Sequence, residues 1–153
     1  MQGPTVTAKT TNDDRAACFS HWPNLHAVAL LDQKKPVALI NRAQFMNEYS
    51  KLYYREVWGR KSCDIHANFQ PRLIEREHCV DELVGILTSQ DQRYLTDGFI
   101  GTGSGRYVGL GTGDQLVRCV ACYADLNNFK PFNDYCGYGR ARSLFDWRRG
   151  DRR

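Results

Sequence analysis

The residue pair whose spacing best suits metal chemistry is a CxxC formed by Cys119 and Cys122. Two thiolates at this spacing can supply half of a tetrahedral zinc site. The other half would need a second CxxC or a pair of histidines, and the sequence offers neither beside this motif. The four histidines are spread along the chain: His21, His26, His66 and His78. We therefore interpret both thiols as structural and reduced rather than as metal ligands.

A glycine-rich stretch at 101–113 (GTGSGRYVGLGTG) could suggest a loop that holds phosphate. The phosphate loop of nucleotide hydrolases ends in Gly-Lys-Ser/Thr and opens a helix within a long βαβ unit, and this stretch does neither. We interpret its glycines as turn formers. No spacing places serine, cysteine and histidine together as a nucleophilic triad. The residue pattern indicates no catalytic constellation.

The elements that would position a site occur twice in the same order, and the first copy begins with an alternating strand at 5–9. A helix over 13–20 follows, which Thr11 or Asn12 can cap. Apolar runs then predict buried strands at 26–31 and 36–40.

The first copy closes with a helix capped by Asn41. Its apolar residues fall at helical spacing on one face: Phe45, Met46, Tyr49, Leu52 and Tyr53. The aromatic residues that extend beyond this helix lack the interleaved basic residues of a base-stacking surface. We interpret Tyr49, Tyr53, Tyr54 and Trp58 as packing or dimer contacts.

The second copy follows a linker at 56–63 and begins with a strand at 71–74. The next helix has apolar residues at i, i+3, i+4 and i+7: Val80, Leu83, Val84 and Leu87. Two short strands at 98–101 and 107–110 come next.

The turn between those two strands contains Gly103 and Gly105, which can adopt positive φ. Thr112 then caps a helix that carries Leu116, Val117 and Val120. Each copy is too small to close a core alone. We expect an α/β (α+β) fold in which two βαββα motifs pack about a pseudo-twofold axis.

This repeat resembles a tandem pair of cystathionine-beta-synthase (CBS) motifs over residues 1–118, with copies at about 4–55 and 64–118. The resemblance implies a cleft for an adenosine-type nucleotide, with a capping Thr or Ser near the phosphate and an Asp on the ribose. The matching positions are Asn41 and Gln44 in the first copy and Thr112, Asp114 and Gln115 in the second. Glutamine replaces aspartate at both ribose positions, and it binds hydroxyls without charge assistance. The alternative is that Asn41 and Thr112 serve only as helix caps.

A second resemblance covers VACYADLNNFKPFNDYCGY at 120–138, which is similar to the opening of the GGDEF domain of diguanylate cyclases. In that family a strand ends at the metal-binding carboxylate. The resemblance therefore implies that Asp125 binds Mg²⁺, that Phe129 and Lys130 lie in a phosphate-cradling turn, and that Asn133 reads guanine, with Asp134 beside it. Hard oxygen ligands beside free amides suit magnesium and triphosphate.

The departures from the GGDEF pattern argue against an enzyme. Ala141 and Arg142 stand where the family has Gly-Asp, and arginine cannot accept hydrogen bonds from guanine. The chain contains neither a Gly-Gly-Asp-Glu-Phe hairpin nor an EAL motif. A GGDEF-like remnant at 119–138 that binds GTP remains the alternative from the enzyme class.

The combined pattern resembles part of a bacterial cyclic-di-GMP signalling protein in which EAL, CBS-pair and GGDEF domains follow in series. It implies a regulatory, ligand-sensing, homodimeric module that acts on its EAL and GGDEF domains. A structural dimerisation spacer is the other reading.

The basic residues are concentrated at the C-terminal end. Residues 140–153 hold six arginines against two aspartates, which accounts for the formal net charge of +4. We expect a disordered tail at 139–153 on a neutral body, and no nucleic-acid partner. No run of about 18 apolar residues predicts a membrane span, and the start lacks a signal sequence, so we expect a cytoplasmic protein.

Overall fold

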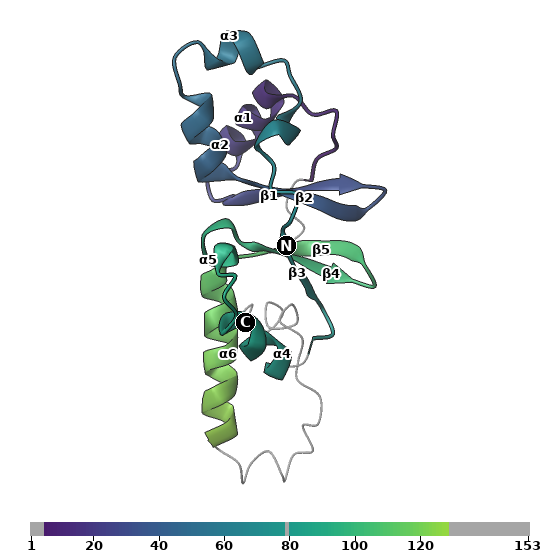
Figure 1. Ribbon diagram of the computed structural model, residues 1–153, viewed down its shortest axis with the longest axis vertical. Helices are drawn as coiled ribbons and strands as arrows, with labels where there is room; N and C mark the ends of the chain where they lie inside the picture. The colour runs from purple at the N-terminus through teal and green to yellow at the C-terminus, as the bar shows by residue number, and fades with distance from the viewer. Residues whose placement is uncertain (1–4, 79, 129–153) are drawn as a thin grey trace.

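The structure, a computed structural model, describes residues 5–78 and 80–128, with the backbone alone described at 80 and 123–128. Figure 1 shows an elongated molecule in which two small sheets lie near the middle and helices extend toward both ends. This mixed α and β architecture, built from two similar halves, confirms the predicted fold class.

The first half contains α1 (Asn12–His21), β1 (Ala27–Asp32), β2 (Lys35–Asn41) and α2 (Arg42–Tyr49). Thr11 caps α1 through a reciprocal capping box with Asp14. Strands β1 and β2 pair antiparallel, as expected for two strands joined by a tight turn. The predicted strand at 5–9 is reduced to a single parallel bridge between Val6 and Leu30.

The segment between the copies is more structured than a linker. It contains α3 (Tyr54–Trp58) and the short 3₁₀ helix η1 (Cys63–His66). The prediction that Leu52 and Tyr53 continue the buried face of α2 is wrong, because they are 82% and 70% exposed. Tyr53 adopts a φ of 61°, so the chain turns at this point and leaves the axis of α2.

The second half contains β3 (Arg72–Glu75), α4 (Val80–Leu87), α5 (Arg93–Asp97), β4 (Phe99–Gly103), β5 (Arg106–Gly111) and α6 (Gly113–Asn128). Strand β3 pairs parallel with β4, and β4 pairs antiparallel with β5. In the β4–β5 turn, Ser104 and Gly105 have positive φ, whereas the sequence suggested Gly103 and Gly105. The short helix α5 was not expected.

A central apolar cluster joins the two halves. It consists of small and aliphatic side chains from both sheets: Ala27, Ala29, Leu39 and Ile100, with Leu31, Tyr107 and Leu110 packed against it. The backbone N–H of Tyr107 also donates to the carbonyl of Lys34 at 3.0 Å. The sheets of both copies therefore bury their apolar faces against each other.

The last described element contradicts one prediction. Helix α6 continues to Asn128, so the segment expected to be a strand ending at Asp125 is helical. The helix continues because apolar residues keep helical spacing along it. Buried Leu116 is followed one turn later by Val120, which is partly buried against the same cluster. It also runs across the boundary predicted between residues 118 and 119, where the CBS pair was expected to end and the GGDEF-like remnant to begin. Phe129, Lys130, Asn133, Asp134 and the tail at 139–153 lie outside the described residues.

Candidate functional site

The N-terminus of α2 lies at the junction of the two halves. The side-chain oxygen of Asn41 accepts a hydrogen bond from the backbone N–H of Gln44 at 3.1 Å, so Asn41 is the helix cap. Its side-chain nitrogen donates to the carbonyl of Thr96 in α5, also at 3.1 Å. Asn41 therefore caps a helix of the first copy and holds a helix of the second copy against it.

The N-terminus of α6 is closed by its own side chains. Thr112 Oγ1 accepts from the N–H of Gln115 at 3.2 Å, and Gln115 Oε1 accepts from the N–H of Thr112 at 3.1 Å. Asp114 forms an exposed ion pair with Arg118, 3.0 Å between Oδ2 and Nε. All three predicted ligand residues of the second copy thus interact with their own helix.

The two helix N-termini differ in charge. The first turn of α2 contains Arg42 and no acidic residue, whereas the first turn of α6 contains Asp114. Arg42 Nη1 donates to the carbonyls of Trp22 and Pro23, at 3.0 and 2.5 Å, which holds the guanidinium near the start of α2. An anion is favoured at a helix N-terminus and disfavoured by a neighbouring carboxylate. The start of α2 is therefore the better of the two for a phosphate.

Packing also distinguishes the two positions. A Cβ added at Gly113, the first residue of α6, would lie 2.6 Å from the Cα of Leu95 in α5. Helix α5 therefore covers the start of α6 closely. Gln44, by contrast, is exposed on α2. The structure brings Asn41 together with Gln44, and Thr112 with Gln115, and the nucleotide roles of these residues stay predictions.

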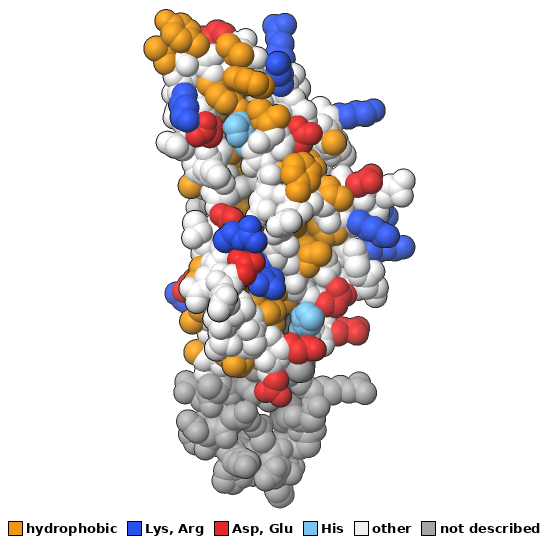
Figure 2. Space-filling model, in the orientation of Figure 1, with side chains coloured by type: hydrophobic (Ala, Val, Ile, Leu, Met, Phe, Trp, Pro, Cys, Tyr) orange, Lys and Arg blue, Asp and Glu red, His pale blue; other side chains and the backbone are white. Residues whose placement is uncertain are grey.

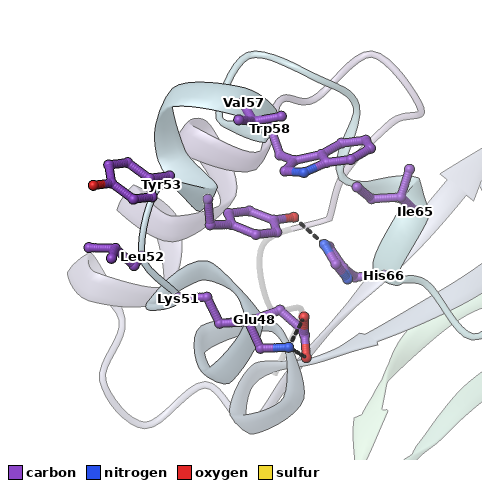
Figure 3. A pocket seen from close by; sticks show the side chains of 9 residues that line it. Glu48, Lys51, Leu52, Tyr53, Val57, Trp58, Ile65 and His66 are labelled. Atoms are coloured by element: carbon purple, nitrogen blue, oxygen red, sulfur yellow. Dashed lines mark hydrogen bonds and ion pairs between the residues drawn. The ribbon is translucent and has the colours of Figure 1, made fainter.

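A second feature, which the ligand signature did not indicate, is a hollow of about 570 Å³ beside α2, α3 and η1 (Figure 3). Its walls are mainly apolar and aromatic: Leu52, Tyr53, Tyr54, Val57, Trp58 and Ile65, with Glu48, Lys51 and His66. The aromatic cluster at 49–58 was the sequence signal for this surface, and it was interpreted as packing or dimer contact.

The polar groups of this hollow pair with one another. Lys51 Nζ lies 2.6 and 2.7 Å from the two carboxylate oxygens of Glu48. Burial lowers the pKa of His66, so its ring is neutral at pH 7 and its Nε2 can accept the hydrogen bond that Tyr54 Oη donates. What the hollow offers to an occupant is mostly apolar surface.

The core of the first half contains a buried arginine. Arg15 is fully buried, and its guanidinium lies within reach of the Cys63 thiol, a weak acceptor, although none of its three side-chain nitrogens forms a hydrogen bond of ordinary geometry. Its guanidinium lies 5.8 Å from the ring centroid of Phe19. It also lowers the pKa of the Cys63 thiol, although burial outweighs this effect and leaves that pKa raised. The first half thus holds a positive charge in a place with little compensation.

Among residues 5–78 and 80–128, no group of three or more His, Cys, Asp or Glu side chains is arranged to hold a metal ion. The side chain of Asp125, the predicted magnesium ligand, is not described. None of the described helices has the length and apolar character needed to cross a membrane.

Comparison with known proteins shows the fold. No family model and no curated protein matches the sequence. Among solved structures, a CBS domain-containing protein from Bacillus anthracis matches with a TM-score of 0.59 and 11% identity, over 77% of this chain and 83% of that one.

Two further similar structures are complexes with a nucleotide. CBSX2, a CBS-pair protein of Arabidopsis thaliana, was solved in complex with AMP and matches with a TM-score of 0.58 and 13% identity, over 79% of this chain and 89% of that one. The cytosolic domain of the Mg²⁺ channel MgtE, in complex with ATP, matches with a TM-score of 0.56 and 11% identity, over 74% of this chain and 43% of that one. The fold of this chain is therefore that of a CBS pair.

Proposed function

We propose that this chain is a regulatory, ligand-sensing CBS pair that is not catalytic itself and acts as a homodimer in the cytoplasm. Its setting is a bacterial cyclic-di-GMP signalling protein, in which it biases attached EAL and GGDEF domains. The CBS-pair fold supports the first part of this proposal, and the two structurally similar proteins solved with AMP and ATP support a nucleotide ligand. The setting rests on sequence resemblance.

The observation that carries the proposal is the double role of Asn41. One side chain binds both the start of α2, through Gln44 N–H, and the α5 helix of the other copy, through the Thr96 carbonyl. A ligand that competes for either bond changes how the two copies are held together. Such a ligand shifts an attached domain only by its difference in affinity for the two arrangements.

The ligand that fits this position best is an adenosine-type nucleotide with its phosphate at the start of α2. The helix N-terminus and the guanidinium of Arg42 both favour an anion there. Gln44, exposed one turn into the helix, can hydrogen-bond the ribose hydroxyls. In the second copy the same positions are engaged in a capping box and an ion pair, so we assign the ligand to the first copy.

The test is a thermal-shift titration of the full chain with AMP, ADP, ATP, S-adenosylmethionine, GTP and cyclic-di-GMP. A ligand bound only by the folded state raises the melting temperature, by an amount equivalent to about 2.7 kcal/mol at 100 times its Kd. We expect a saturable shift with one of the adenosine compounds. If none of the six ligands shifts the melting temperature, the sensing function is wrong.

The alternative function is a structural spacer, which the self-contained capping of Thr112 and Gln115 favours. It predicts no shift with any nucleotide. A GTP-binding GGDEF remnant predicts instead a GTP shift that needs Mg²⁺ and disappears in Asp125→Asn. The same titration therefore separates the three functions.

A further inference from the structure

Helix α6, the long green helix of the second half in Figure 1, carries two cysteines that the proposed function does not use. Cys119 and Cys122 are three residues apart within this continuous helix, so their side chains lie one above the other on the same face. Both are free thiols. Cys122 is exposed and Cys119 is half-buried, so a small ion can reach the pair from solvent.

The two thiols are close enough to influence each other. Burial raises the pKa of the Cys119 thiol, and the neighbouring Cys122 raises it further, because two thiolates side by side repel each other. The helical spacing separates their Cβ atoms by about 5–6 Å, and a sulfur on each Cβ can turn toward the other. One ion between the two sulfurs can therefore contact both.

The number and kind of ligands decide which ion fits this dithiol. Structural zinc needs four ligands, and magnesium and calcium need several oxygens. Figure 2 shows acidic side chains near the end of the molecule that holds α4. Across residues 5–78 and 80–128, however, no three His, Cys, Asp or Glu groups are arranged around one ion. Thiolates select soft ions, and the soft ion that two thiolates alone can satisfy is Cu(I).

Electrostatic attraction does not explain the choice of ion. Arg118 precedes Cys122 by one helical turn and Asp125 follows it by one turn, so the nearest formal charges along this face of α6 cancel. Arg118 is itself paired with Asp114. Selection at this position rests on the chemistry of sulfur, which distinguishes it from a carboxylate site for a hard cation.

We propose that Cys119 and Cys122 form a binding site for one cuprous ion. Two S–H bonds break and two S–Cu bonds form, and both protons leave to solvent. Copper stays monovalent throughout, so the step transfers no electrons. The site lies on a different element from Asn41 and does not depend on the proposed nucleotide.

The first test is an anaerobic titration of the reduced full chain with Cu(I), in competition with the chromophoric chelator bicinchoninate. A background variant with Cys18, Cys79 and Cys136 replaced by serine keeps the dithiol, and its one other cysteine is fully buried. We expect this background to bind one ion. Calorimetry in buffers of different ionisation enthalpy should show the release of about two protons per ion.

The second test removes each thiol in that background. Cys119→Ser or Cys122→Ser should weaken Cu(I) binding at least about ten-fold, because even the outer-shell partners of a metal contribute about 10- to 100-fold. Asp125→Asn should change the affinity by less than about two-fold, because a soft ion gains little from a carboxylate.

The matched control moves one thiol without changing the number of thiols. Ala121→Cys combined with Cys122→Ala changes two exposed positions, and residues two apart do not face each other on a helix. The affinity should fall as far as it does in Cys122→Ser. Circular dichroism of each variant checks that the helix is intact.

Three results would overturn the inference: a background variant that takes no Cu(I) from bicinchoninate, an unchanged affinity when the thiol moves to position 121, or an affinity that depends on Asp125 rather than on the cysteines. A failed nucleotide titration would leave the copper site standing. Conversely, nucleotide binding by a chain that takes up no Cu(I) would refute this site and leave the sensing function standing.

Discussion

The two halves share an order of elements but bury different side chains. In the first half, Phe19 and Phe45 pack beside a fully buried Arg15, whose guanidinium lies near the Cys63 thiol and the Phe19 ring. In the second half, the buried cluster consists of Ile74, Leu83, Tyr94, Phe99 and Leu116, and none of the charged side chains described in that half is buried. Toward the central junction, however, both halves present small and aliphatic side chains. The comparison indicates that the shared junction, rather than the individual cores, defines the fold, which leaves each half free to differ in stability and surface.

The most damaging test of this comparison removes one large side chain from each core. We expect Phe45→Ala to lower the free energy of unfolding by about 3–5 kcal/mol and Leu116→Ala by about 2–5 kcal/mol. If the junction couples the halves, each variant should unfold in one transition. Tryptophan fluorescence and circular dichroism should then report the same transition midpoint. Of the described tryptophans, Trp22 lies in the first half and Trp58 in the α3 segment that follows it. Loss of Leu116 with no shift of the fluorescence transition would show that the halves unfold separately.

The buried arginine offers the next largest effect. Replacing Arg15 by Met removes a buried charge that faces a thiol, a weak acceptor, and an aromatic ring, so the free energy of unfolding should rise by about 1–3 kcal/mol. The control is Arg42→Met. Arg42 lies at the same distance from the Phe19 ring, 5.8 Å, but donates to two carbonyls, so its loss should destabilise. Urea denaturation measures both, and a destabilised Arg15→Met protein would show that the contacts of the guanidinium with Cys63 and Phe19 outweigh the cost of burying its charge.

The two helix caps sharpen the comparison further. Thr112→Ala should cost about 1 kcal/mol, as cap removal usually does. Asn41→Ala should cost about 1 kcal/mol more, because it also loses the bond to Thr96. Asn41→Asp keeps the cap acceptor but loses the donor, so its stability should fall between the wild type and Asn41→Ala. Equal costs for Asn41→Ala and Thr112→Ala would mean that the bond between the copies contributes nothing.

The smallest expected effect is a pH dependence confined to the first half. Burial lowers the pKa of His66 in the folded state, so the unfolded chain binds a proton more readily. Stability should therefore decrease as the pH falls through the unfolded-state value of about 6.5 and level off below the folded-state pKa. Melting temperatures between pH 5 and 8 measure this, and His66→Gln should flatten the profile. An unchanged slope in the variant would assign the effect to another group.

Much of the fold was predictable because its signals are local. Asn41 and Thr112 cap helices as their residue types suggest, and the apolar run at 26–31 forms a buried strand. The missed elements depend on non-local or unusual backbone features. The turn at Tyr53 requires a left-handed residue that the apolar spacing of the segment does not indicate, so the sequence left open whether its aromatic residues pack inside or form contacts at the surface.

The candidate site was predictable only in part, for two physical reasons. The first reason is that the side chains of Asn41 and Gln115 hydrogen-bond to backbone groups, which residue types do not identify. The Thr96 carbonyl that Asn41 binds is also 55 residues away in sequence. The second reason is that the strand expected to end at Asp125 does not form. The apolar residues keep helical spacing through Val120, and this pattern outweighs the local resemblance to the GGDEF family.

The most direct test of the central claim is an isothermal calorimetric titration of AMP into the wild-type chain and its two cap variants. Asn41→Ala and Thr112→Ala each remove one cap, but only Asn41 lies at the assigned ligand position. We expect saturable binding to the wild type, a similar affinity in Thr112→Ala, and an affinity at least ten-fold weaker in Asn41→Ala. Equal binding by all three proteins would contradict the assigned position, and no binding by the wild type would contradict AMP sensing itself.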